Sequence, residues 1–136
     1  MHRRLCGALL AEEVEVARDV VGHRATFDQQ GTTVYANATC NGQAVCLRFE
    51  GPNYNAEPLS CQAVDPDTHR PLAAERWPPG LGAGPHPSLP RPFICILGLY
   101  EYHCHFSHVD AAWDRYRYRY PFYNLVRIVL DRAGCP

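Results

Sequence analysis

Two histidines flank a cysteine in the segment His103-Cys104-His105, and another histidine follows at His108. A thiolate with imidazoles is a donor set that binds copper, and the same side chain types can serve as nucleophile and base. Along an extended strand, Cys104 would point to one side while His103 and His105 point to the other. The segment therefore predicts either a copper site or an inward cysteine between exposed histidines.

The stretch 98–113 resembles the copper loop of multicopper oxidases, which carries a pattern of the form G-x-Y-x-[WY]-H-C-H followed by a further histidine. By this resemblance Cys104 and His108 would bind type 1 copper, while His103 and His105 would face a second copper site. A tryptophan stands where the family has an axial Met or Leu, and the family's other histidine motifs are missing. The resemblance implies a copper-binding or redox domain similar to a fragment of such an oxidase, with copper as its cofactor.

The competing interpretation places Cys104 in a disulfide and needs no cofactor. The chain has seven cysteines at scattered positions without a CxxC pair, which is typical of disulfides in small extracytoplasmic domains. Cys40 is the preferred partner, because a Cys40–Cys104 bond would match the inter-sheet bridge of immunoglobulin-like domains. The further disulfide candidates are Cys46, Cys61, Cys6 and Cys135. An odd count leaves one thiol free, bound to metal, or joined to another chain by an intermolecular disulfide.

The clearest local structure is a hairpin. Thr32–Cys40 is predicted to be a strand because apolar and polar residues alternate along it. Asn41-Gly42 is a strong hairpin-turn signal, and Ala44–Glu50 would return beside the first strand. Asn37 falls on the outer face of this hairpin and begins the sequon Asn-Ala-Thr, which predicts glycosylation.

Later segments are also predicted to be extended. Phe93–Phe106 alternates in character, Arg115–Tyr120 alternates strictly between Arg and Tyr, and Leu125–Leu130 is apolar and rich in β-branched residues. A helix from Phe122 to Arg132 competes with the last of these strands. Near the start, Ala8–Val21 carries an apolar stripe that favours a short N-terminal helix.

Residues 51–92 hold most of the prolines and are predicted to form one long loop, because proline fixes φ and removes a backbone donor. Loops of this length often carry function. Trp77 is predicted to anchor the loop to the core.

The alternation of Arg and Tyr predicts a binding surface. Arginines in a row can clamp sulfate, phosphate or carboxylate groups, and Arg and Tyr are enriched at the centres of protein interfaces. The predicted binding residues are Arg115, Arg117, Arg119, Tyr116, Tyr118 and Trp77. The alternative is an exposed sheet face whose charges deter pairing between sheet edges.

Length and composition set the class of protein. The chain has 136 residues and a net charge of −1, which fits a single domain over 1–136 and disfavours nucleic acid as a partner. Its apolar runs are too short for a membrane span, and Leu5–Ala11 does not predict an intact signal peptide. His108 with Asp110 could form an acid–base pair, but no nucleophile motif accompanies it, so an enzyme is disfavoured unless copper binds.

These observations predict a mainly β fold, an antiparallel Greek-key sandwich of immunoglobulin-like or cupredoxin-like type. Tyr102-His103-Cys104, then Trp113-Asp114-Arg115 and Pro121-Phe122, also resembles a stretch of glycoprotein L of alphaherpesviruses, which implies a binding role. We therefore expect a secreted or surface-exposed binding module, such as a viral or cell-surface glycoprotein domain, with a protein or an anionic glycan as its partner. Both this interpretation and the copper site depend on residues 100–106 being extended.

Overall fold

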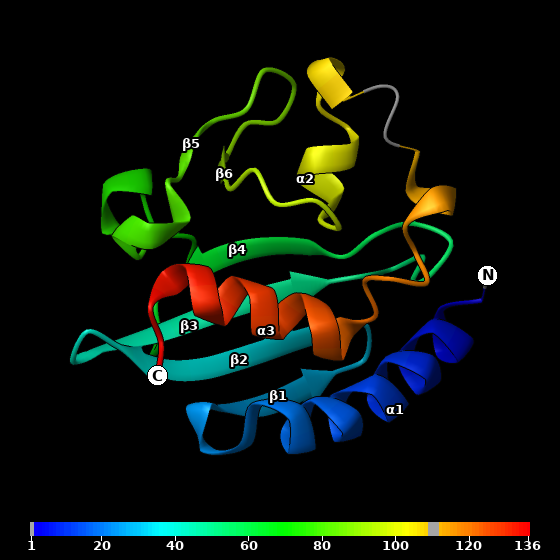
Figure 1. Ribbon diagram of the computed structural model, residues 1–136, viewed down its shortest axis with the longest axis horizontal. Coiled ribbons are helices and arrows are strands. Elements are labelled where there is room, and N and C mark those ends of the chain that lie inside the picture. The colour runs from blue at the N-terminus through cyan, green and yellow to red at the C-terminus, as the bar shows by residue number, and fades with distance from the viewer. Residues whose placement is uncertain (1, 109–111) are drawn as a thin grey trace.

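The computed structural model describes residues 2–108 and 112–136, and its centre is an antiparallel sheet of four strands (Figure 1). The strands are β1 (Ala25–Gln30), β2 (Thr33–Cys40), β3 (Gln43–Glu50) and β4 (Ser60–Val64). Each strand pairs with the next one along the chain, so the sheet is a meander. The predicted hairpin is confirmed, with Asn41 and Gly42 at positive φ in the turn between β2 and β3.

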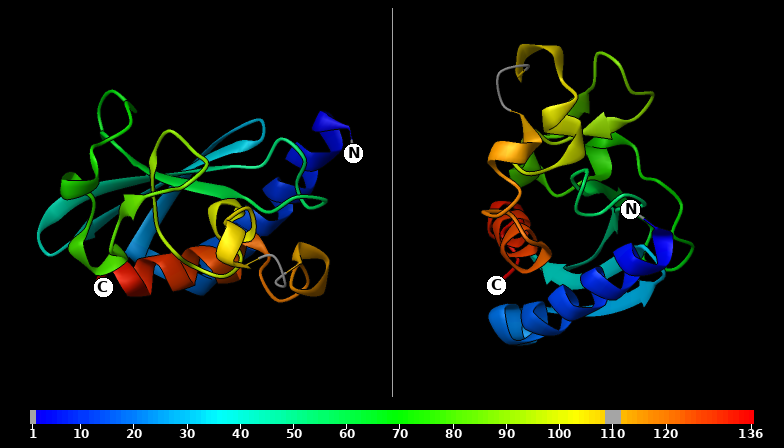
Figure 2. Two further views of the ribbon diagram at one scale, coloured as in Figure 1. Left: turned by 90° about the horizontal axis from the view of Figure 1, so that it is seen from above. Right: turned by 90° about the vertical axis from the view of Figure 1, so that its right-hand side faces the viewer.

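Two helices cover one face of this sheet. In α1 (Arg3–Val21) the inward side chains recur at helical spacing and are Cys6, Leu10, Val14, Ala17 and Val21. In α3 (Phe122–Ala133) they are Phe122, Leu125, Val126, Val129, Leu130 and Ala133. Both sets belong to one apolar core with the inward residues of the sheet. In Figure 1, α3 crosses in front of the sheet while α1 runs beside β1, and Figure 2 gives the same arrangement from two further sides. The predicted N-terminal helix is confirmed and is longer than expected.

Most of the chain between β4 and α3 forms a lobe beyond β4, at the top of Figure 1. It contains a small pair of strands, β5 (Gly84–Pro85) with β6 (Pro92–Phe93), and the single-turn helix α2 (Tyr100–His103). Short 3-10 turns lie at Gly22–Arg24, Ala74–Arg76, Pro79–Leu81, Phe106–His108 and Trp113–Arg115. No helix among the described residues is both long enough and apolar enough to span a bilayer.

The expected Greek-key sandwich differs from this architecture. The antiparallel sheet is present, but α1 and α3 occupy the face on which a second sheet was expected, so the fold is mixed α and β. β4 was missed because it lies inside the proline-rich stretch 51–92. All of β4 except its first residue is buried, so it lacks the alternation that marks a half-exposed strand.

Two predicted strands are wrong in the lobe. Phe93–Phe106 is extended only at its start, because the chain turns at Gly98, where φ is +107°, and then forms α2. Arg115–Tyr120 is a 3-10 turn followed by hydrogen-bonded turns, in which the amide of Arg117 donates to the carbonyl of Trp113 at 2.9 Å. The alternation of Arg with Tyr therefore does not require a strand, because here it occurs in a series of turns.

The closing strand predicted at Leu125–Leu130 is also wrong, and the competing helix is correct. The apolar residues of this stretch fit both patterns, but only a helix places Phe122 and the five buried residues after it on one stripe. The Phe122 ring packs edge-on against Phe27 of β1 and Phe49 of β3, with centroids 5.6 and 5.3 Å away. The helix ends at Gly134, which adopts a left-handed conformation with φ of +73°.

The outer face of the sheet carries the sequon. Asn37 is in register with Thr26 of β1 and Cys46 of β3, on the face opposite the core. Its side chain is half-buried, and Thr39 two residues later is exposed. The expected outward position of Asn37 is therefore confirmed, whereas its glycosylation stays a prediction.

One disulfide joins Cys40, at the end of β2, to Cys135, just beyond α3. The expected Cys40–Cys104 bond is therefore wrong, although both bonded residues were disulfide candidates. Cys104 lies in the lobe at the end of α2, because the stretch that holds it is not a strand facing Cys40. The bond that forms instead ties the C-terminal helix to the sheet.

A polar contact fixes the start of α3 to α1. The Tyr54 hydroxyl, on a fully buried side chain, donates to Glu13 Oε1 at 2.5 Å, and the Phe122 amide donates to the same oxygen at 2.7 Å. Burial raises the pKa of Glu13, and these two hydrogen bonds partly oppose that rise. The contact joins α1, the loop after β3 and α3 at one point.

We expect Tyr54→Phe to lower the free energy of unfolding by about 1.5 kcal/mol, because it removes a buried hydrogen bond to a carboxylate. Urea unfolding followed by circular dichroism measures this change. Tyr118→Phe is the matched control, since Tyr118 is 79 % exposed and should change stability by less than about 0.5 kcal/mol. Equal losses in the two variants would contradict a role for the buried contact.

Candidate functional site

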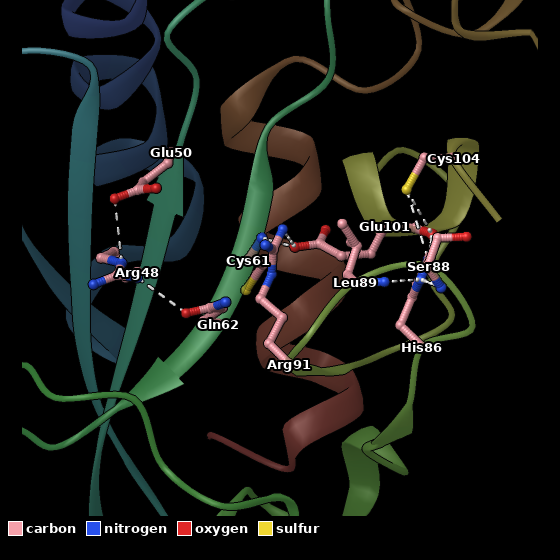
Figure 3. A network of polar contacts seen from close by, with 10 residues as sticks. All are labelled: Arg48, Glu50, Cys61, Gln62, His86, Ser88, Leu89, Arg91, Glu101 and Cys104. Carbon is pink, nitrogen blue, oxygen red and sulfur yellow. Dashed lines mark hydrogen bonds and ion pairs between the residues drawn. The ribbon is translucent and has the colours of Figure 1, made fainter.

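The lobe is held on the sheet by Glu101 of α2, whose side chain is fully buried (Figure 3). Glu101 Oε1 accepts a hydrogen bond from the Cys61 amide of β4 at 3.2 Å and forms an ion pair with Arg91 at 3.3 Å. This one oxygen therefore connects α2, the end of the β5–β6 loop and the sheet. Glu101 Oε2 and Arg91 Nε have no hydrogen-bond partner among the described residues.

His86 lies on the other side of α2 and is also buried. Its Nδ1 accepts hydrogen bonds from the amides of Ser88 and Leu89, at 3.0 and 3.1 Å. Nε2 must then carry the proton of the neutral ring, and it lies 3.0 Å from the Glu101 carbonyl and 3.6 Å from Cys104 Sγ. His86 thus presents an N–H to Cys104 and cannot take the thiol proton.

The electrostatics of this network favour neutral groups. Burial raises the pKa of Glu101, with Arg91 acting in the opposite direction. Burial and then the nearby Glu101 raise the pKa of Cys104. Cys104 is therefore a poor source of thiolate, and the network serves to position the loops of the lobe.

The residues expected to bind copper are each engaged in other contacts. His103 Nε2 accepts from the Gly98 amide at 3.2 Å, and His105 Nδ1 accepts from the Ser107 amide at 3.1 Å. His108 Nε2 lies 3.5 Å from Cys95 Sγ, a cysteine outside the expected set. Among the described residues, no three His, Cys, Asp or Glu side chains are arranged to hold a metal ion. These residues do not fit a copper centre, and Asp110 of the suggested acid–base pair lies outside the described residues.

Aromatic and imidazole rings form a continuous series of contacts through the lobe. Phe106 stacks on His105, whose ring lies 5.4 Å from that of His108. His108 stacks on Tyr102 at 3.9 Å, and Tyr102 contacts His103 at 5.3 Å. The His103 ring then lies 5.4 Å from Trp113 and 5.9 Å from Tyr116. This series connects α2 to the segment that carries the arginines.

The segment that carries the arginines, residues 113–120, is fixed by close packing against the rest of the protein. The Trp113 indole is buried and donates to the Asn55 carbonyl at 2.9 Å. The Tyr120 ring packs on Gly98 so closely that an added Cβ would lie 2.9 Å from it. A side chain at this position is therefore excluded both by the ring and by the positive φ.

The exposed side chains near the two ends of this series of rings are aromatic residues and arginines. Phe106 is 69 % exposed and Tyr118 is 79 % exposed, while Arg115 and Arg119 are also exposed. The Arg117 guanidinium stacks over the Tyr118 ring at 4.9 Å and donates to its hydroxyl at 2.8 Å. We refer to Phe106, Arg115, Arg117, Tyr118 and Arg119 as the aromatic–arginine surface.

Trp77 takes no part in this surface. Its side chain is buried in the core, and its indole N–H donates to the Leu72 carbonyl at 3.0 Å. The expected anchoring of the loop is confirmed, and the ring is not open to a partner. Tyr116 is half-buried beneath the arginines.

The predicted strand Phe93–Phe106 would place Glu101 on the same exposed face as His103 and His105, and the sequence predicted no role for Arg91 or His86. The network depends on contacts between residues far apart in the sequence, such as Glu101 with Cys61. A glutamate inside an otherwise apolar and aromatic stretch is the one local signal that could have indicated a buried charge.

No protein-family model matches the chain, and no curated protein matches it at a significant level.

Proposed function

We propose that the chain is an extracytoplasmic protein-binding module, and that the aromatic–arginine surface contacts its partner. The observation that carries this proposal is the exposure of Phe106 and Tyr118 near the two ends of a series of packed rings. Binding of a partner over large exposed rings is favourable in free energy, because each ring buries a large apolar area on contact. Arg115 and Arg119 would fix the register of a partner through carboxylates or backbone carbonyls.

Pre-organisation supports the same function. The Arg117–Tyr118 stack already fixes two side chains that would otherwise lose rotamer freedom on binding. The support beneath them, from Trp113 and Tyr120, holds the segment in a defined shape. Exposed rings on a supported loop are the arrangement that interface hot spots use.

The extracytoplasmic setting is supported by the cysteine chemistry. The Cys40–Cys135 bond is of a kind that persists in oxidising compartments and is rare in the cytosol of mesophiles. The sequon at Asn37 lies on the outward face of the sheet, away from the aromatic–arginine segment in the sequence. We propose that Asn37 is glycosylated, which mass spectrometry of protein secreted from a eukaryotic host tests directly.

A binding comparison tests the proposal. The purified wild-type protein is screened by surface plasmon resonance against a panel of purified extracellular receptor domains. For each domain that binds, the affinity is measured again with a variant carrying Phe106→Ala and Tyr118→Ala. We expect at least about a tenfold weakening, because truncating an aromatic hot spot removes 1–3 kcal/mol or more.

A matched control removes exposed apolar side chains elsewhere. Leu5, Val16 and Val20 of α1 are 62, 43 and 44 % exposed, so their joint replacement by Ala removes comparable apolar surface. We expect this variant to bind as the wild type does. If the α1 variant loses affinity and the Phe106/Tyr118 variant does not, the aromatic–arginine surface is the wrong face.

A further inference from the structure

We propose that Cys95 and His108 form a thiol–disulfide exchange site through which the protein becomes covalently linked to a polypeptide that carries an accessible disulfide. The thiol of Cys95 is exposed and takes part in no disulfide. Its Sγ lies 3.5 Å from His108 Nε2, which is within reach of a sulfur hydrogen bond. A nucleophile beside a base is the arrangement that generates a thiolate.

A third group orients the base. The His108 ring stacks on Tyr102 at 3.9 Å, with 11° between the planes. Tyr102 belongs to α2, which the Glu101 network holds on the sheet. The stack therefore holds the His108 ring by one face and leaves its Nε2 edge directed at Cys95, as a base is held by its orienting residue in other nucleophilic sites. Tyr102 is a positioning residue in this account.

Cys104 supplies an internal comparison, because it too lies beside an imidazole. The neighbouring His86 has its Nδ1 occupied by two backbone amides, so its Nε2 is a donor toward Cys104 Sγ. His86 cannot accept the Cys104 proton, whereas Nε2 of His108 can accept the proton of Cys95. The two cysteines also differ in exposure, since Cys95 is exposed and Cys104 is half-buried.

The other thiols are unsuited to exchange. Cys46 and Cys61 are buried, and burial raises the pKa of Cys46 to about 11 and that of Cys61 well above its ordinary value. Cys6 of α1 is buried in the core. Because the thiolate is the attacking species, exposure and a nearby proton acceptor select Cys95.

The exchange is balanced without an added oxidant. His108 Nε2 takes the proton of Cys95, and the thiolate attacks one sulfur of the partner's disulfide. A bond forms between Cys95 Sγ and that sulfur while the partner's S–S bond breaks, and the leaving thiolate recovers the proton from His108. The lone pair of the Cys95 thiolate forms the new bond, and the pair of the broken S–S bond leaves with the departing sulfur, so Cys95 is oxidised and that sulfur is reduced.

Glutathione disulfide is the probe that tests this site, so the test does not depend on the proposed binding partner. The full-length protein, with the Cys40–Cys135 bond intact, is incubated with glutathione disulfide near neutral pH and quenched with acid at intervals. Peptide mapping by mass spectrometry gives the rate of adduct formation at each cysteine. We expect Cys95 to react about tenfold or more faster than Cys104.

His108→Gln is expected to slow the reaction of Cys95 by about tenfold, while Tyr102→Phe, which keeps the stacked ring, leaves it within about twofold. In guanidinium-unfolded protein the rates of Cys95 and Cys104 should converge in every variant, which separates the effect of the site from intrinsic reactivity. The proposal is overturned if Cys104 reacts first, if no adduct forms at Cys95, or if His108→Gln reacts at the wild-type rate.

Discussion

Replacing Cys40 and Cys135 together by Ala is expected to lower the free energy of unfolding by about 4 kcal/mol. The bond closes a loop with a sequence separation of 95 residues, which includes β3, β4, the lobe and α3. Without it, the unfolded chain regains the conformational freedom that this loop closure removes. The bond also holds the end of α3 beside the end of β2, so we expect the C-terminal turn to fray in the variant.

Guanidinium unfolding under non-reducing conditions measures this loss. Cys95→Ala is the matched control, because it removes an exposed thiol that takes part in no disulfide and should change stability by less than about 0.5 kcal/mol. Wild-type protein treated with reductant should unfold as the double variant does. A double variant as stable as the wild type would show that Cys40 and Cys135 are not bonded in solution.

Glu101→Ala is expected to lower the free energy of unfolding by about 3 kcal/mol, because it leaves both partners of a buried carboxylate unsatisfied. The Cys61 amide loses its acceptor, and Arg91 loses its counter-charge. Since the Arg91 side chain is 27 % exposed, water compensates part of that loss, and we take the lower end of the usual range. Urea unfolding measures the change.

Glu101→Gln is the conservative comparison, because its amide oxygen can still accept from the Cys61 amide. We expect a loss of about 1 kcal/mol, well below that of the Ala variant. Hydrogen exchange should also show a specific opening of residues 84–108 in Glu101→Ala, with little change in β2 and β3. Equal behaviour of the Ala and Gln variants would mean that the carboxylate does not anchor the lobe.

Glu101 is also expected to affect how the stability of the protein varies with pH. Its pKa in the folded protein is raised by burial above the ordinary value of 4.5, so the folded state binds more protons than the unfolded state between these two pKa values. Stability therefore falls as pH rises through that window, which is the reverse of a salt-bridged carboxylate with a lowered pKa. We expect the wild type to lose stability relative to Glu101→Gln as pH rises above about 4.5, and the difference between the two to stay constant below that pH. A wild type that instead gained on the Gln variant over that range would contradict a raised pKa.

The first part of the fold could be predicted because its signals are local. An apolar stripe gives α1, and alternation with an Asn-Gly turn gives β2 and β3. The later part could not be predicted, because the same sequence pattern is compatible with more than one secondary structure. The alternation in 115–120 fits a strand and a run of turns alike, and only packing against Trp113 and Gly98 decides between them.

The candidate site shows the same division. Arg115, Arg119 and Tyr118 were predicted from residue type and from their alternation along an expected strand; they are exposed, although the segment forms turns. The network beneath them depends on Glu101 meeting Cys61, and the exchange site depends on Cys95 meeting His108. Such contacts arise from the folding back of the chain, which neither spacing nor composition describes.

The most direct test of the account is the ratio of two affinities for one extracellular receptor domain that binds the wild type. The dissociation constant of the Phe106/Tyr118 double-Ala variant is divided by that of the Leu5/Val16/Val20 triple-Ala variant. A ratio of about ten or more is expected if the rings of the lobe carry recognition. A ratio near or below one, or a wild type that binds no domain of the panel, would contradict it.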